Sequence, residues 1–183
     1  MKKRDLLLFV LAAALKVATG MAQSNTLLVY GAVTIDSQKA GTETSSSYGF
    51  SPAIGYQWND QWTGGINLNL AGTNYTDKSS EVAVGPFIRY TKSLGGLFAV
   101  YGQFNANSLS GKTGNISYSG FQGTLFPAIG VNLKNSFALN FTFGSLGFTS
   151  QKFDNTPNAQ THFHFGFGSG AGFGISKNFG LKK

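Results

Sequence analysis

Apolar residues occupy every second position along most of the chain, and small neutral residues fill the positions between them. The stretch from Ser119 to Asn132 is typical. Its apolar members are Phe121, Gly123, Leu125, Pro127, Ile129 and Val131. A repeat of two is typical of a β-strand whose two faces meet different surroundings. The pattern returns about eight times in 183 residues. We therefore expect eight strands and an all-β fold.

The alternation and the turn residues together place the strands. The predicted strands cover residues 26–38, 44–58, 62–75, 79–92, 97–108, 116–133, 137–150 and 160–179. Three connections are short, at 59–61, 93–96 and 134–136, and the others, near 39–43, 76–78, 109–115 and 151–159, are polar and mostly longer. Bacterial outer-membrane barrels have short periplasmic turns and longer extracellular loops. If the N-terminus of such a barrel enters from the periplasm, the second, fourth and sixth connections are the periplasmic ones, and these are the three short ones.

The seventh predicted strand contains an irregularity. Its apolar positions are odd-numbered up to Phe143 and even-numbered at Leu146 and Phe148. A β-bulge near residues 144–147 would reset the phase of the strand. Alternatively, the lipid-facing part ends there and the remainder protrudes as a ribbon. The sequence leaves both interpretations open.

The face opposite the apolar residues distinguishes a membrane barrel from a soluble one. A periplasmic sandwich or a lipocalin-like barrel would show the same repeat, but its polar face would meet water and carry many charges. Here charged residues are only 11 % of the chain, against about 25 % in a typical soluble domain. Small neutral side chains suit the crowded interior of an eight-stranded barrel. The sequence therefore predicts an eight-stranded antiparallel up-and-down transmembrane β-barrel.

Glycines mark the interior face of the last predicted strand. They share one parity and are Gly166, Gly168, Gly170, Gly172 and Gly174. Glycine weakens a solvent-exposed strand because it contributes no packing and loses much conformational entropy. We expect these glycines to lie opposite bulky interior side chains, namely Tyr30, Phe87, Tyr101 and Phe126.

The N-terminus has the features of a cleaved secretory signal. Basic residues at 2–4 precede an apolar stretch at 6–15, and Gly20 and Ala22 stand at the −3 and −1 positions of a cleavage site. Ten apolar residues are too few for a membrane helix, which needs about 20. The sequence thus divides into a signal peptide, 1–22, and one barrel domain, 23–183. Removing the signal's four basic residues and one acid lowers the net charge from +7 to +4.

Aromatic residues gather beside the short turns. We expect them to form a girdle at one membrane interface, as in other membrane barrels. The predicted girdle residues are Trp58, Trp62, Tyr90, Phe98, Phe137 and Phe179.

Three segments carry a resemblance to a known family. They are Ser45–Tyr56, Gly85–Tyr90 and Phe126–Val131, in which Pro-Ala-Ile-Gly of the first recurs in the third. The chain resembles the bacterial outer membrane protein β-barrel domain family, often labelled "porin family protein", with an architecture similar to small OmpA/OmpX-type barrels. The resemblance covers nearly all of the mature chain. It implies a C-terminal aromatic signal for the barrel-insertion machinery, which Gly174 and Phe179 fit, with Lys177 where a second apolar residue is usual.

Few residues carry chemistry in the predicted lumen. The predicted polar lumen residues are Glu81, Arg89, Asn67, Asn69, Gln103, Gln122 and Asn140. Glu81 and Arg89 are eight residues apart, roughly 26 Å along a strand, so each needs a partner from another strand or lumen water.

The two histidines are the weak candidates for a metal site. His162 and His164 share one strand face, but a metal site normally needs three or four ligands and the chain has no cysteine. We expect two polar residues of the interior or rim. Ser150, Asp154 and either histidine are close enough in sequence to suggest an outer-leaflet, lipid-modifying enzyme, although the histidines have interior parity.

These observations favour a non-enzymatic outer-membrane protein with a structural or surface-interaction role in the envelope. We expect no catalytic residue, no cofactor and no resident metal. The expected partners are outer-membrane lipid and, during biogenesis, the barrel-insertion machinery. We expect no nucleic-acid partner, and we expect the chain to be a monomer. A narrow pore or small-solute binder is the first alternative, and the lipid-modifying enzyme is the second.

Overall fold

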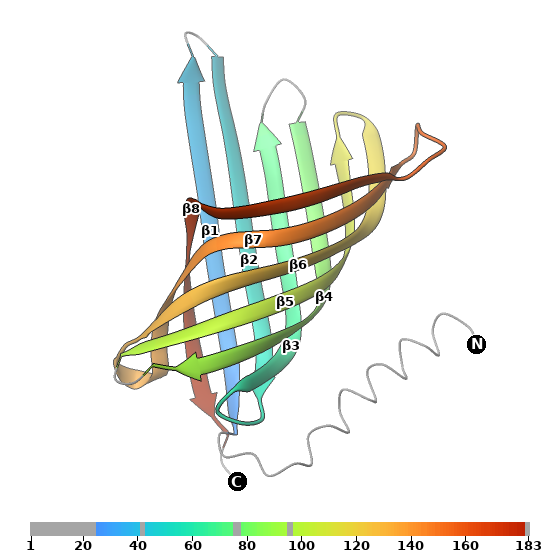
Figure 1. Cartoon of the computed structure of the whole chain (residues 1–183). Helices are drawn as coiled ribbons and strands as arrows, with labels where there is room; N and C mark the ends of the chain where they lie inside the picture. The colour runs from blue at the N-terminus through green and yellow to red at the C-terminus, as the bar shows by residue number, and fades with distance from the viewer. Residues whose placement is uncertain (1–24, 41–42, 75–77, 95–96, 182–183) are drawn as a thin grey trace, which may run out of the picture.

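The protein is a closed barrel of eight antiparallel strands in which each strand pairs with its neighbours in the sequence and β8 returns to β1 (Figure 1). The computed structural model describes residues 25–40, 43–74, 78–94 and 97–181. The strands are β1 (Thr26–Ala40), β2 (Glu43–Gln57), β3 (Trp62–Asn74), β4 (Lys78–Ser93), β5 (Phe98–Thr113), β6 (Ile116–Asn132), β7 (Phe137–Phe153) and β8 (Gln160–Gly180). The prediction of eight strands in an up-and-down barrel is confirmed. The predicted signal peptide, 1–22, lies outside the described residues and stays a prediction.

The described residues contain no helix that is both long enough and apolar enough to cross a membrane.

One predicted connection is wrong. Residues 109–115 were expected to form a loop, but β5 continues to Thr113 and pairs with β6 as far as Thr113↔Ile116. A two-residue turn, with Gly114 at a φ of 57°, joins the strands. Leu109, which is 2 % exposed, packs inside the barrel with Ala83 and Tyr118 and keeps this end of the hairpin in the wall. The contrast in connection length is therefore weaker than the sequence predicted.

The two ends of the barrel differ in their aromatic residues. The short turns 58–61, 94–97 and 133–136 lie at one end, called here the girdle end, and the other connections lie at the opposite, loop end. At the girdle end Trp62 stands opposite Tyr90, with ring centroids 4.9 Å apart. Lys177 places Nζ 4.4 Å from the centroid of Phe137 and 5.1 Å from that of Phe179. The lysine thus spreads its apolar stem over the girdle, with its charge held by cation–π contacts.

The wall presents apolar side chains outward along the predicted parity. On β4, for example, Val82, Val84 and Ile88 are exposed, whereas Ala83, Phe87 and Arg89 are buried. This arrangement reverses that of a soluble barrel, and it suits lipid outside and packed side chains inside.

The irregularity in the seventh strand is a bulge. The β6–β7 register changes between Leu125↔Leu146 and Ala128↔Thr142, so residues 143–145 of β7 stand opposite only two residues of β6. Beyond the bulge, even-numbered residues of β7 face outward. The bulge interpretation is confirmed, and β7 remains part of the wall to its loop end.

Three prolines interrupt the hydrogen-bonded ladder in mid-wall. The β2–β3 ladder has no partners between Phe50 and Ala53, and the β4–β5 ladder has none between Val84 and Phe87. Pro52 and Pro86 lie in these gaps, and Pro127 lies in the corresponding β6–β7 gap. Proline lacks the N–H that would point to the next strand. Asn67 Nδ2 fills part of the second gap by donating to Gly85 O at 2.9 Å.

The interior leaves no room for a side chain at Gly55. A Cβ at this position would lie 2.7 Å from Phe87 Cζ and 3.0 Å from Thr63 Cγ2, whereas a Cβ at Gly31 would have no neighbour within 4 Å. We expect Gly55→Ala to lower the free energy of unfolding by about 1–3 kcal/mol through overpacking, and Gly31→Ala to leave it unchanged or to raise it slightly. Urea unfolding in lipid vesicles measures both. Equal effects would contradict this interior packing.

Candidate functional site

Arg89 closes the barrel near the girdle end. Its side chain is 5 % exposed, and Nε donates to Gln103 Oε1 at 2.8 Å. Its guanidinium carbon lies 4.1 Å from the ring centroid of Tyr101 and 5.5 Å from that of Tyr30. Phe87 is buried beside them. These five side chains, from the three strands β1, β4 and β5, are called the floor cluster.

The floor cluster holds a positive charge without a negative partner among the described residues. Arg89 Nη2 and Tyr101 Oη are both buried and have no hydrogen-bond partner. The faces of Tyr101 and Tyr30 provide the favourable electrostatic contact through cation–π interaction. An ion following the lumen would have to displace this packed, positively charged layer.

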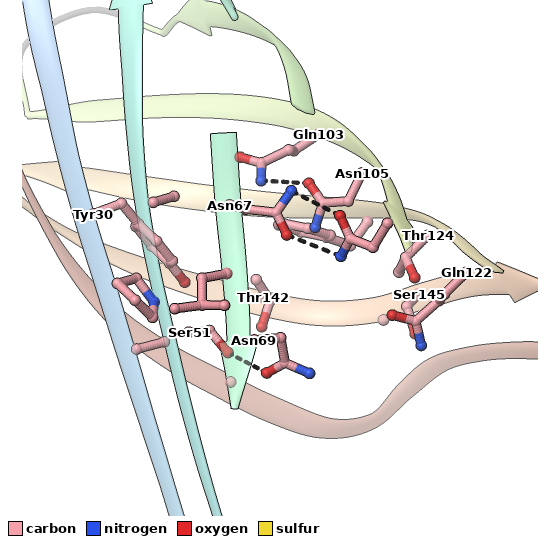
Figure 2. A pocket seen from close by; sticks show the side chains of 18 of the residues that line it. Tyr30, Ser51, Asn67, Asn69, Gln103, Asn105, Gln122, Thr124, Thr142 and Ser145 are labelled. Carbon is pink, nitrogen blue, oxygen red and sulfur yellow. Dashed lines mark hydrogen bonds between the residues drawn. The ribbon is translucent and has the colours of Figure 1, made fainter. Parts of the chain in front are cut away.

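Above the floor cluster lies a cavity of about 510 Å³. Seven strands contribute to its wall, and none of the lining residues is an Asp, Glu, Lys or Arg. Six of the lining side chains are amides: Asn67, Asn69, Gln103, Asn105, Asn107 and Gln122. In Figure 2 the labelled polar groups point into this shared space from different strands. The volume falls within the range of small-molecule sites.

The amides on one side of the cavity bond to each other. Asn67 and Asn107 exchange two hydrogen bonds, of 3.0 and 2.9 Å, and Gln103 Nε2 donates to Asn105 Oδ1 at 2.8 Å (Figure 2). Ser51 donates to Asn69 Oδ1 at 2.8 Å on another part of the wall. Such pairs fix the amide orientations, because burying an amide without a partner is costly. The remaining amide groups are oriented toward the cavity.

The structure places the seven predicted lumen residues inside the barrel. Asn67, Arg89, Gln103 and Asn140 are buried, and Asn140 Nδ2 donates to Ser176 Oγ at 2.9 Å. Asn69 and Gln122 line the cavity. Glu81 lies apart from these residues, near the loop end.

Glu81 belongs to a second hollow of about 370 Å³. Its Oε2 accepts hydrogen bonds from Tyr118 Oη at 3.0 Å and Gln151 Nε2 at 3.5 Å. A tilted strand crosses the hydrocarbon with roughly ten residues. Tyr118, the third residue of β6 at the loop end, lies outside that stretch. Burial and the Glu81 carboxylate raise the pKa of Tyr118 to about 12, so the phenol remains a donor at neutral pH. Glu81 and Arg89 thus each have a partner from another strand.

The histidines lie apart from other metal-ligating groups. His162 and His164 are exposed on the loop-end half of β8, opposite Thr149 and Gly147 of β7, and His164 lines the cavity. No group of three His, Cys, Asp or Glu side chains that could hold a metal occurs in the described residues. Ser150 pairs with Thr161, one position along, and so faces the opposite side of the hairpin from both histidines. The structure therefore does not bring Ser150 and a histidine together.

Sequence reasoning missed Asn105 and Asn107. Both share the odd parity of Tyr101 and Gln103 on β5, and that parity was the available signal. The predicted strand 97–108 contains both residues, but parity assigns a face and not a height, so it did not show that Asn107 would meet Asn67.

The comparisons with known proteins bear on the fold. No protein-family model matches the chain, and no curated protein matches it significantly. Among solved structures, Neisserial surface protein A matches with a TM-score of 0.54 at 8 % identity, covering 84 % of this chain and 96 % of that one. The chain has the fold of the small eight-stranded outer-membrane barrels. The outer membrane protein OprG from Pseudomonas aeruginosa also matches, with a TM-score of 0.51 at 11 % identity over 87 % and 98 % of the two chains.

The small outer-membrane barrel fold accounts for the outward apolar face, the aromatic end and the filled interior. At these identities the likeness carries no residue of a site from either neighbour to this chain. The function must therefore be argued from the floor cluster and the cavity.

Proposed function

We propose that this chain is an integral outer-membrane protein whose barrel does not conduct and whose role is structural, with loop-end hairpins available for surface contacts. The floor cluster carries this proposal. Arg89 is buried across the lumen, and its charge would repel cations entering from either end. The girdle end faces the periplasm in this arrangement, because both termini of such barrels lie there.

Conductance in planar bilayers tests the closed lumen. We expect the refolded wild-type barrel to give no discrete current steps in potassium chloride at moderate voltages of either sign. Insertion is checked separately by the heat-dependent change in gel migration that folded barrels show. Reproducible steps from protein that passes this check would overturn the closed-lumen proposal.

A small-solute binding barrel is the second candidate function. It is favoured by the 510 Å³ cavity, which is uncharged and rich in amide groups. A barrel that served as a scaffold only would be expected to fill this space with side chains, since eight strands enclose room for little else.

Enzymatic activity is not part of the proposal. The lipid-modifying alternative required a serine, a histidine and an acid to meet. Ser150 and the histidines lie on opposite faces of the β7–β8 hairpin, and this separation favours a non-enzymatic role.

A further inference from the structure

The wall of the barrel is open between β1 and β8 in its loop-end half. The β1–β8 ladder runs from Thr26↔Gly180 to Ala32↔Gly174 and ends there. On their other sides the same strands stay paired much further, to Ala40↔Glu43 and to Gln151↔Gln160. Residues 33–40 of β1 and 160–173 of β8 therefore each have a free edge on this side. The gap between them is called the seam.

A wide bulge in β8 produces the seam. Thr142 pairs with Gly172, but Gly144 pairs with Phe167, so residues 168–171 of β8 stand opposite Phe143 alone. Gly168, at a φ of 73°, adopts a conformation that side chains disfavour. The ribbon of β8 bends sharply between its halves, and the loop-end half turns away from the direction of β1 (Figure 1). Glycines of this strand thus permit the bend as well as the close packing of Gly174 against Tyr30.

The seam lies at membrane height. Leu27 pairs with the girdle residue Phe179. At about 3.3 Å per residue and a tilt of about 45°, Val33 and Ile35 stand roughly 14 and 19 Å above Leu27, within an apolar band about 25 Å tall. The seam therefore opens sideways to the acyl chains of the membrane.

The edges of the seam are apolar and unusually exposed. Val33 and Ile35 are 60 % and 78 % exposed, and Phe163, Phe165 and Phe167 are 63 %, 69 % and 66 % exposed. Outward side chains in the continuous wall are less exposed; Val84 and Leu125 are both 46 % exposed. Aliphatic and aromatic edges of this kind suit an alkyl chain.

The seam opens into the uncharged cavity. Ala32 and Gly172, at the end of the β1–β8 ladder, line the cavity together with Gly166 and His164. Six amides lie on its wall, without a carboxylate, lysine or arginine to neutralise a charged ligand. A charged head group would lose hydration without gaining a partner, whereas hydroxyl or amide groups would be matched.

We infer that the cavity binds the neutral, hydroxyl- or amide-bearing head of a single-chain amphipath, whose alkyl chain lies in the seam and continues into the membrane. This inference rests on the second candidate function, the small-solute binding barrel. It adds the chemical class of the ligand and the route by which the ligand enters. It does not require the floor cluster to open.

Binding of three matched probes to the barrel in lipid nanodiscs tests the inference. The probes are n-octyl β-D-glucoside below its micelle concentration, glucose, and n-octyl sulfate, each measured against empty nanodiscs. We expect saturable binding of one octyl glucoside per barrel, with glucose and octyl sulfate at least about tenfold weaker, since each lacks one matched part of the ligand.

Substitutions locate the binding. Ala32→Phe places a ring at the junction of seam and cavity, and Gln122→Met removes a cavity amide while retaining its length. Each is expected to weaken octyl glucoside binding about tenfold, roughly one lost polar or packing contact. Leu125→Phe, on the outward face of the closed wall, is the matched control and should bind normally. Heat-dependent gel migration checks that every variant folds, and Ala32→Leu replaces Ala32→Phe if the latter does not.

The possible outcomes distinguish a failure of the inference from a failure of the small-solute binding function on which it rests. If glucose binds as well as octyl glucoside and Ala32→Phe has no effect, the cavity binds solutes but entry through the seam is wrong. If octyl sulfate binds as tightly, the requirement for a neutral head is wrong. If no probe binds saturably to folded protein, both the inference and the small-solute function are overturned.

Discussion

Val84→Arg is expected to destabilise the folded barrel in lipid bilayers by about 2–4 kcal/mol, the range for a basic side chain at the bilayer midplane of a membrane barrel. Val84 is exposed on the outer face of β4 and pairs with Leu68 of β3. It stands six residues above the girdle residue Tyr90, roughly 14 Å in height for a tilted strand. The guanidinium there has no water to hydrate it. Urea-dependent unfolding from phosphatidylcholine vesicles, followed by the fluorescence of Trp58 and Trp62, measures the loss.

Gln122→Arg provides the matched control. Gln122 lies on β6 at the wall of the cavity, so a longer charged side chain there can extend along the lumen toward the loop end. We expect its stability to stay within about 1 kcal/mol of wild type. Equal losses in the two variants, or a larger loss for Gln122→Arg, would contradict the assignment of the outward and inward faces.

Arg89→Ala is expected to be the most damaging single truncation inside the barrel, with a loss of about 3–4 kcal/mol. The substitution removes the side chain that packs between the Tyr101 and Tyr30 rings and leaves Gln103 Oε1 without its donor. The estimate combines a large-to-small core substitution with a buried unsatisfied acceptor. The same variant is expected to conduct in planar bilayers, because the floor cluster no longer fills the lumen.

Arg89→Met separates packing from charge. Methionine retains most of the length and makes favourable sulfur–aromatic contacts. It also removes a buried charge whose Nη2 lacks a partner, and replacing buried charge by apolar volume is often close to neutral. Gln103 Oε1 loses its donor in this variant too, so we expect a loss of about 1–2 kcal/mol, smaller than that of Arg89→Ala, and no conductance. If Met is as damaging as Ala, the charge itself stabilises the floor cluster, and its packing is secondary.

The paired amides show what strand parity can and cannot predict. The odd parity of the polar residues on β3 and on β5, opposite even-numbered apolar residues, was enough to place Asn67, Asn69 and Gln103 inside. Parity assigns a face because successive side chains of a strand point to opposite sides. It does not assign a height, because height depends on the register between strands. The double hydrogen bond of Asn67 and Asn107, forty positions apart, follows only from the shared level of β3 and β5 across β4.

The alternation predicted the bulge in β7 but not the tight hairpin between β5 and β6. The change of parity between Phe143 and Leu146 indicated a bulge, since a period of two can shift phase only by an added residue. The polar run around Leu109 suggested a loop. Leu109 continues the inward odd parity of β5, and only its packing with Ala83 and Tyr118 shows that the hairpin stays in the wall.

By itself, the sequence determined the strand number, the inward and outward faces, the aromatic end and an interior with few charges, because these follow from local alternation and composition. The tertiary structure alone decided three things: the stacking of Arg89, the existence of the cavity and the opening of the seam. Each depends on pairing between distant segments. Closure joins β1 to β8, the strands furthest apart in the chain, and their ladder stops at Ala32↔Gly174 because β8 bulges against β7. The glycine-rich part of β8, which the alternation assigned to one face, is the place where the wall bends and the β1–β8 pairing stops.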